Sequence, residues 1–133
     1  MNSHLSYEQQ EGIHIFVWYS ANRRAVDSWL GWMSKLVERD GQLGSIIIDF
    51  SGIPLPPISY MARAVRAWMQ QYPTVPYTQI AVIYAETEVA FLILGRSYAM
   101  TLSRGRDVSL KFFQDSDADQ VWQWLNAGSA ASS

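Results

Sequence analysis

Strand patterns and helix patterns alternate along this chain without a linker-like gap between them, and this alternation constrains the fold most. Runs rich in β-branched and aromatic residues predict strands at 12–19, 45–50, 79–84 and 108–113. Helical patterns follow these runs at 22–39, 59–72, 87–102 and from Ser116 onward. Strands joined by single helices are mostly parallel. We therefore expect an α/β fold with an open, mostly parallel sheet of four or five strands.

The same alternation predicts one domain. The polar segment 4–11 is ambiguous and fits at most an antiparallel edge strand, so the element order is (β)β-α-β-α-β-α-β-α. Small and polar residues fill the last seven positions, 127–133. We therefore expect a single domain over 1–126 and a flexible tail over 127–133.

Composition excludes several classes of function. The chain of 133 residues contains no cysteine and two histidines, and its net charge is −2. Cysteine-ligated metals are therefore excluded, a histidine metal site is disfavoured, and the basic field needed for nucleic-acid binding is absent. The longest apolar run, 89–94, is far shorter than the roughly 20 residues of a membrane span. We expect a cytoplasmic protein without a bound metal or cofactor.

Two motifs bear on catalysis and ligand binding. The segment Gly95-Arg96-Ser97-Tyr98-Ala99 imitates a nucleophile elbow, but its serine falls inside a helical pattern rather than at a strand-to-helix turn. No glycine-rich phosphate loop is present. Asp49 ends a buried strand, where it either anchors a polar ligand or accepts hydrogen bonds from the Ser51-Gly52 turn. We therefore expect no enzymatic activity.

The predicted helix at 87–102 is apolar all round, which is unusual for a surface helix. If one side packs on the sheet, the outward side is formed by Val89, Leu92, Ile93, Arg96 and Met100. An exposed apolar patch of this kind marks an interface or a ligand groove. Homodimerisation through this helix is the preferred interpretation. The alternative is an apolar small molecule held between this helix and the preceding one.

Three stretches resemble the STAS superfamily, and in particular its small bacterial SpoIIAA-like domains. The run Ile46-Ile47-Ile48-Asp49-Phe50-Ser51-Gly52-Ile53 resembles the central strand and loop of that family. The stretch 80–84 resembles the next strand, and Phe112, Phe113, Ala118, Trp124 and Leu125 resemble the closing strand and helix. The resemblance covers about 12–126, and it implies regulation by protein–protein contact.

The family's phosphorylated motif is only partly present. Anti-sigma-factor antagonists carry Asp-Ser-Ser-Gly at the start of the helix after the central strand, and those places fall on Pro57, Ile58, Ser59 and Tyr60. Ser59 corresponds to the second serine of the motif. It is therefore either a phospho-acceptor or the N-cap of its helix. Together the residues and the resemblance predict a protein-interaction domain that uses loop 51–59 and the apolar helix.

Overall fold

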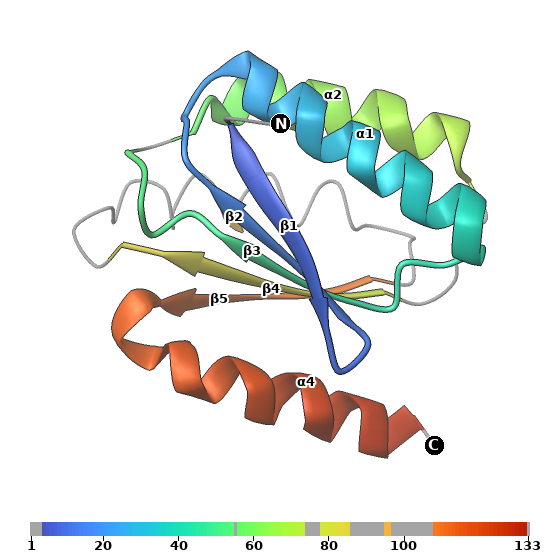
Figure 1. The fold of residues 1–133 in the computed structure, drawn as a ribbon, viewed down its shortest axis with the longest axis vertical. Coiled ribbons are helices and arrows are strands. Elements are labelled where there is room, and N and C mark those ends of the chain that lie inside the picture. The colour runs from blue at the N-terminus through green and yellow to red at the C-terminus, as the bar shows by residue number, and fades with distance from the viewer. Residues whose placement is uncertain (1–3, 55, 74–77, 86–94, 97–107, 133) are drawn as a thin grey trace.

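Five strands form one sheet in the order in which they occur along the chain (Figure 1). The computed structural model describes residues 4–54, 56–73, 78–85, 95–96 and 108–132. The elements are β1 (Leu5–Gln10), β2 (Ile13–Trp18), α1 (Arg23–Asp40), β3 (Ser45–Asp49), α2 (Ile58–Gln71), β4 (Thr78–Tyr84), β5 (Val108–Gln114), the 3-10 helix η1 (Asp115–Asp117) and α4 (Ala118–Ser132). β1 is antiparallel to β2, and all later neighbours are parallel. The α/β class and the mostly parallel sheet are therefore confirmed.

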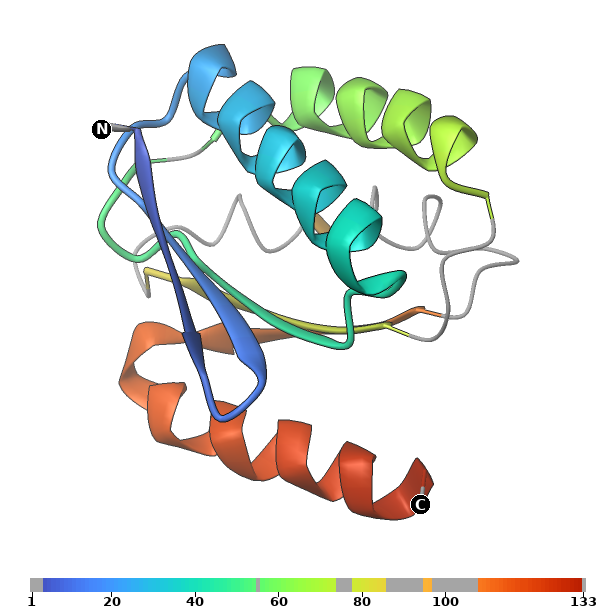
Figure 2. The same ribbon diagram turned by 45° about the vertical axis from the view of Figure 1, so that its right-hand side comes forward.

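The helices form layers on both sides of the sheet. α1 and α2 cover one face, and α4 covers the other (Figures 1 and 2). Parallel strands that follow one another in spatial order require crossovers of the same hand, so α1 and α2 must lie on the same face. None of the helices that the structure describes has the length and apolarity needed to cross a membrane.

The central strands are buried on both faces, which explains their nearly continuous apolar sequences. Phe16 and Trp18 of β2 point into the cluster under α1 and α2, and both are 0% exposed. Their neighbours Ile13 and Ile15 point into the second cluster, which contains Val121 of α4. β2 therefore joins two hydrophobic cores.

Both ends of α1 lie within one residue of the predicted range 22–39. Oδ1 of Asn22 accepts a hydrogen bond of 3.0 Å from the amide of Ala25, which makes Asn22 the N-cap. Gly41 has a φ of 75°, and its amide donates to the carbonyl oxygen of Val37 at 2.7 Å. Glycine adopts this left-handed conformation without a steric penalty, so the helix ends there.

The Asn22 cap makes a measurable contribution to stability. Asn22→Ala is expected to lower the free energy of unfolding by about 1 kcal/mol, because a helix-terminal amide loses its acceptor. Urea denaturation monitored by circular dichroism measures this loss. Asn126→Ala, on the exposed side of α4, is the matched control and should change the free energy by less than about 0.5 kcal/mol. Equal effects of the two variants would contradict the capping role.

Hydrogen bonds from two aromatic side chains of α2 and from Tyr72, its C-cap, connect α2 to α1. Only Ile58 and Ala62 of this helix are buried. The bonds are Tyr60 Oη to Asp27 at 2.6 Å, Trp68 Nε1 to Ser34 at 2.9 Å and Tyr72 Oη to Glu38 at 3.0 Å. The spacing of the donors places them on one side of α2, so they form a ladder along the two helices.

Two predicted helix starts were wrong. α2 begins at Ile58 with Pro57 at the N-cap, whereas Ser59 was one of the expected caps. The last helix begins at Ala118 after η1 rather than at Ser116. α4 runs on to Ser132, and the flexible tail expected over 127–133 stays a prediction. Alanines within the last residues favour helix propagation, which explains the longer helix.

Candidate functional site

The strongest candidate surface lies where the parallel strands end, and we call it the carboxyl edge. It consists of segment 19–22 after β2, residues 50–54 and 56–57 after β3, the amino ends of α1 and α2, and η1 after β5. Open α/β sheets place ligands and partners at this edge because loops from adjacent strands meet there. The predicted loop and Ser59 both lie on it.

Asp49 organises the loop after β3. Its Oδ1 accepts hydrogen bonds from the Ser51 amide at 2.8 Å and the Ser51 hydroxyl at 2.6 Å. The amide of Ile53 then donates to the carbonyl oxygen of Phe50 at 3.2 Å, which closes a turn around exposed Gly52. Of the two roles considered for Asp49, the hydrogen-bonded structural role is observed. The carboxylate therefore shapes the loop.

Ser59 lies in the first turn of α2, and its side chain is exposed. No side chain caps this helix, since Pro57 occupies the N-cap. The N-cap lies two residues before Ser59 because Ile58 is buried in the core, and proline is well tolerated at a helix start. Ser59 therefore does not cap the helix, and it occupies an exposed position at the carboxyl edge.

Tyr60 connects the amino ends of the two helices. Its hydroxyl donates to Asp27, and this hydrogen bond, with burial as a second cause, raises the pKa of Tyr60. The nearby cations Arg23 and Arg63 oppose this shift in pKa. The guanidinium carbon of Arg23 lies 5.0 Å from the centre of the Tyr60 ring. The edge beside Ser59 is therefore cationic as well as aromatic.

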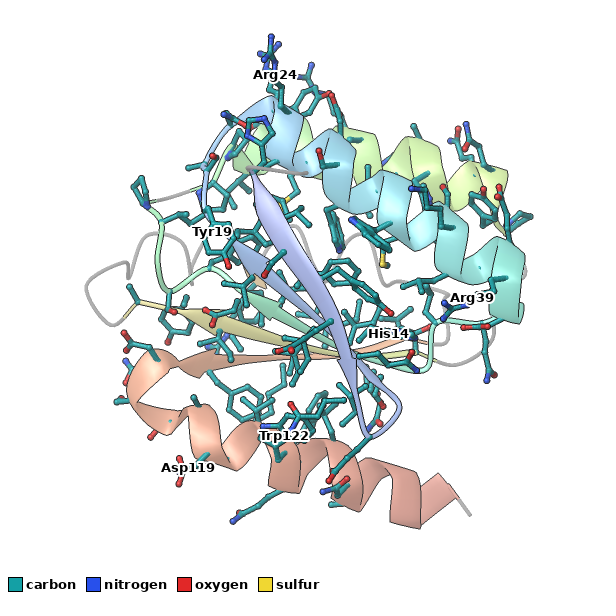
Figure 3. All side chains as sticks on the ribbon, in the orientation of Figure 1. His14, Tyr19, Arg24, Arg39, Asp119 and Trp122 are labelled. Carbon is teal, nitrogen blue, oxygen red and sulfur yellow. The ribbon has the colours of Figure 1, made fainter. Side chains whose placement is uncertain are left out.

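Tyr19 is the one large hydrophobic side chain among the described residues that is exposed, with 59% of its surface accessible. It directly follows β2, and Figure 3 shows it at the same end of the molecule as the labelled Arg24. Its hydroxyl donates a hydrogen bond of 3.1 Å to the Ser6 hydroxyl. Tyrosine is enriched among the residues that contribute most to binding at protein interfaces.

The predicted apolar helix cannot be compared with the structure. Val89, Leu92, Ile93 and Met100 lie outside the described residues. Arg96 is described and is exposed in a helical conformation. The interface hypothesis for these positions therefore stays a prediction.

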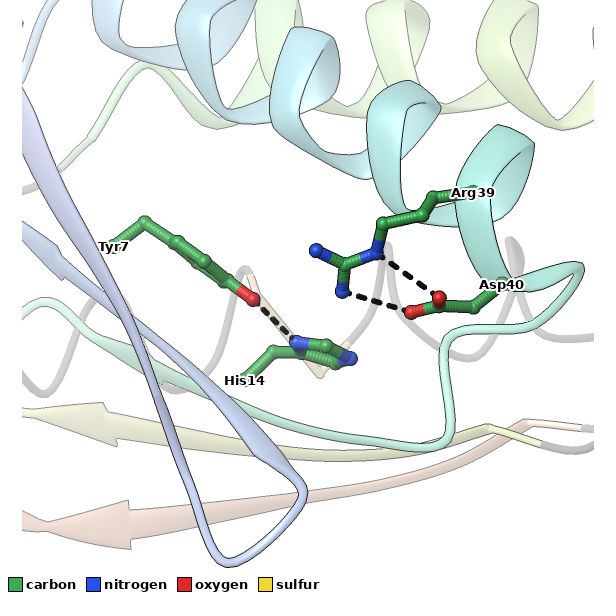
Figure 4. Close-up of polar contacts among 4 residues, drawn as sticks. All are labelled: Tyr7, His14, Arg39 and Asp40. Carbon is green, nitrogen blue, oxygen red and sulfur yellow. Dashed lines mark hydrogen bonds and ion pairs between the residues drawn. The ribbon is translucent and has the colours of Figure 1, made fainter.

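A second polar cluster lies at the opposite edge of the sheet and had not been predicted. The Tyr7 hydroxyl lies 2.7 Å from Nδ1 of His14, and it donates this hydrogen bond when the ring carries its proton on Nε2. Arg39 and Asp40 approach from the end of α1 and are joined by two hydrogen bonds of 3.0 and 2.9 Å (Figure 4). The contact between Tyr7 and His14 could have been found from the β1–β2 hairpin, because Gln10 pairs with Ile13 across a two-residue turn.

Burial dominates the electrostatics of this cluster. His14 is 4% exposed, and burial lowers its pKa from the ordinary value of 6.5. Asp40 opposes that change in pKa, whereas Arg39 reinforces it. The hydrogen bonds from Arg39 lower the pKa of Asp40 itself. The imidazole is consequently held neutral against the Tyr7 hydroxyl, which suits a structural hydrogen bond.

Neither histidine contributes to a recognisable metal site. His4 approaches Ser20, with Nδ1 and Oγ 3.3 Å apart, while His14 pairs with Tyr7. Over the part of the chain that the structure describes, no three metal-ligating side chains come together.

Compared with family models, with curated proteins and with solved structures, the chain finds no match.

Proposed function

We propose that this chain is a SpoIIAA-like protein-interaction domain that acts as a homodimer. Its contact surface combines the carboxyl edge, including loop 51–59, with the apolar segment 89–100. The observation that carries the proposal is the position of Tyr19. This exposed aromatic side chain directly follows Trp18, whose carbonyl oxygen lies against the Gly52 turn. Tyrosine and tryptophan are enriched at the centres of protein interfaces.

Ser59 gives the proposed surface a means of regulation. It is exposed, and Arg63 lies one helical turn further along α2. A phosphate on Ser59 would bring a charge of about −2 to the amino end of the helix, where free amides and arginine favour it. Phosphorylation would thereby change the charge of the surface that meets the partner.

Self-association tests the proposal directly. The wild-type chain is expected to sediment as a dimer at high micromolar concentration, and Ile93→Glu is expected to convert it to a monomer because a charge would enter the apolar interface. Leu92→Glu should act in the same way. Analytical ultracentrifugation measures the change in mass.

The matched control for this test is Gln123→Glu, which adds the same charge on the exposed side of α4. It should leave the dimer intact. A wild-type chain that is monomeric at high micromolar concentration would sink the homodimer proposal. A dimer that Ile93→Glu and Leu92→Glu leave unchanged would remove segment 89–100 from the interface.

A second candidate function is the binding of an apolar small molecule. The observation in its favour is that Met61, Val65 and Trp68 of α2 are only half-buried. A monomer whose melting temperature rises with a long-chain fatty acid would favour this function over the interaction domain.

A further inference from the structure

The charges of this chain are distributed unevenly over the fold. Six of its ten basic side chains lie on α1 and α2, although the net charge of the chain is −2. These six are Arg23, Arg24, Lys35, Arg39, Arg63 and Arg66. α2 contains no acidic residue at all. The helical layer on this face is therefore cationic.

The carboxylates of this layer are already engaged. Asp27 accepts a hydrogen bond from Tyr60, Glu38 accepts one from Tyr72, and Asp40 is paired with Arg39. By contrast, four exposed arginines form no ion pair with any carboxylate among the described residues. They are Arg23, Arg24, Arg63 and Arg66. Exposed cations on an otherwise acidic protein favour an anionic partner.

An anionic surface lies on the other side of the sheet. Asp115 and Asp117 belong to η1, and Asp119 belongs to the first turn of α4. η1 and α4 contain no lysine or arginine, and no described cation forms an ion pair with these aspartates. The nearest basic residue before them, Lys111, lies over the Phe113 ring.

The two surfaces flank the same edge. α1 and α2 begin at the carboxyl edge on one face of the sheet, and η1 leaves β5 at that edge on the other face (Figures 1 and 2). In Figure 3 the labelled Arg24 and Asp119 mark the two sides. A two-fold axis running along the edge turns a second copy over, so that its anionic side meets the cationic side of the first. The same rotation brings the remaining two surfaces together, which closes the dimer.

We propose that two copies of this chain dock carboxyl edge to carboxyl edge, with the arginines of each copy facing Asp115, Asp117 and Asp119 of the other. This inference rests on the proposed homodimer and specifies its geometry and its charge pairing. Tyr19 and the loop after β3 lie between the two charged surfaces and form the centre of the contact. The partner at the carboxyl edge is a second copy of this chain, because this chain carries both of the complementary charged surfaces.

Reciprocal charge reversal tests the pairing. The first variant combines Arg24→Glu with Arg63→Glu, and the second combines Asp115→Lys with Asp119→Lys. Each variant alone presents like charges across the two-fold axis, so its dimer dissociation constant should rise by at least about 100-fold. An equimolar mixture restores opposite charges, so a heterodimer should form within about tenfold of wild-type affinity. Sedimentation velocity with one variant fluorescently labelled measures both.

Two controls complete the test. Lys35→Glu combined with Gln70→Glu makes a similar change of charge on the same helical layer, away from the carboxyl edge, and should leave the dimer intact. Circular dichroism should show both charge variants folded, since all the substituted side chains are exposed. Raising the salt from 0.1 to 1 M should raise the dissociation constant of the wild-type dimer, because screening shortens the range of the charges from about 10 to about 3 Å.

The outcomes separate this inference from the proposed function. A wild-type dimer that both charge variants leave intact, but that Ile93→Glu disrupts, would overturn the edge-to-edge pairing and leave the proposed function standing. A mixture that stays monomeric while wild type dimerises would also overturn the pairing. A monomeric wild type that binds a labelled DNA duplex or an acidic peptide would replace the second copy with that partner, and it would contradict the homodimer itself.

Discussion

Trp18→Ala is expected to lower the free energy of unfolding by about 3–5 kcal/mol, because it removes a fully buried indole from the core. Trp18 is 0% exposed, and its ring centre lies 4.8 Å from that of Phe50 and 6.0 Å from that of Trp29. Neighbours on β2, on α1 and after β3 would all lose contacts, and the cavity cannot close without moving a helix or a strand. Urea denaturation monitored by circular dichroism measures the loss.

Two further variants keep this prediction interpretable. Trp122→Ala removes a half-buried tryptophan on α4 and should cost less, because part of that side chain already contacts water. Trp18→Phe retains an aromatic ring and removes a buried indole N–H that has no acceptor among the described residues. It should therefore cost less than half as much as Trp18→Ala. Equal losses for Trp18→Ala and Trp122→Ala would contradict the central position of Trp18.

The strands and helices could be predicted because the sequence patterns that indicate them are local. The run 45–50 is apolar except for Ser45 and Asp49, and residues 45–49 form β3 in the centre of the sheet, with β2 and β4 on either side. The hydrogen bonds from Ser51 to Asp49 were also predictable, since the two residues are neighbours in the chain. Patterns of this kind need no knowledge of tertiary structure.

Contacts between distant segments were harder to predict. The serine at position 59 has a strong local preference for a helix cap, but burial of Ile58 moved the start of the helix. The Tyr7–His14 pair depends on the register of a polar edge strand, which becomes clear only once the turn at 11–12 is known. The arginines of α1 and α2 and the aspartates of η1 and α4 lie on opposite faces of the sheet. Only the topology of the sheet shows that both groups flank the carboxyl edge.

His14 is expected to make the protein less stable as the pH falls from about 7 through the ordinary histidine pKa of 6.5. Burial lowers the pKa of His14 in the folded chain, so just below pH 6.5 the unfolded chain binds more protons. Stability then rises with pH across this window and is lost as the pH falls toward the lowered folded pKa. One proton limits the slope to about 1.4 kcal/mol per pH unit.

Urea denaturation between pH 5 and pH 7.5 measures this slope, and comparison of two variants assigns it to His14. His14→Gln should remove the histidine contribution and leave only the slope due to the acidic groups. His4→Gln replaces the other histidine, so comparison of the two variants separates the contribution of His14 from that of His4. Protonation of His14 would place a cation beside Arg39 and remove the acceptor of the Tyr7 hydroxyl, so acid should weaken the attachment of β1 first. Hydrogen exchange of the β1 amides that rises with acid no faster in wild type than in His14→Gln would show that His14 does not hold this edge strand in place.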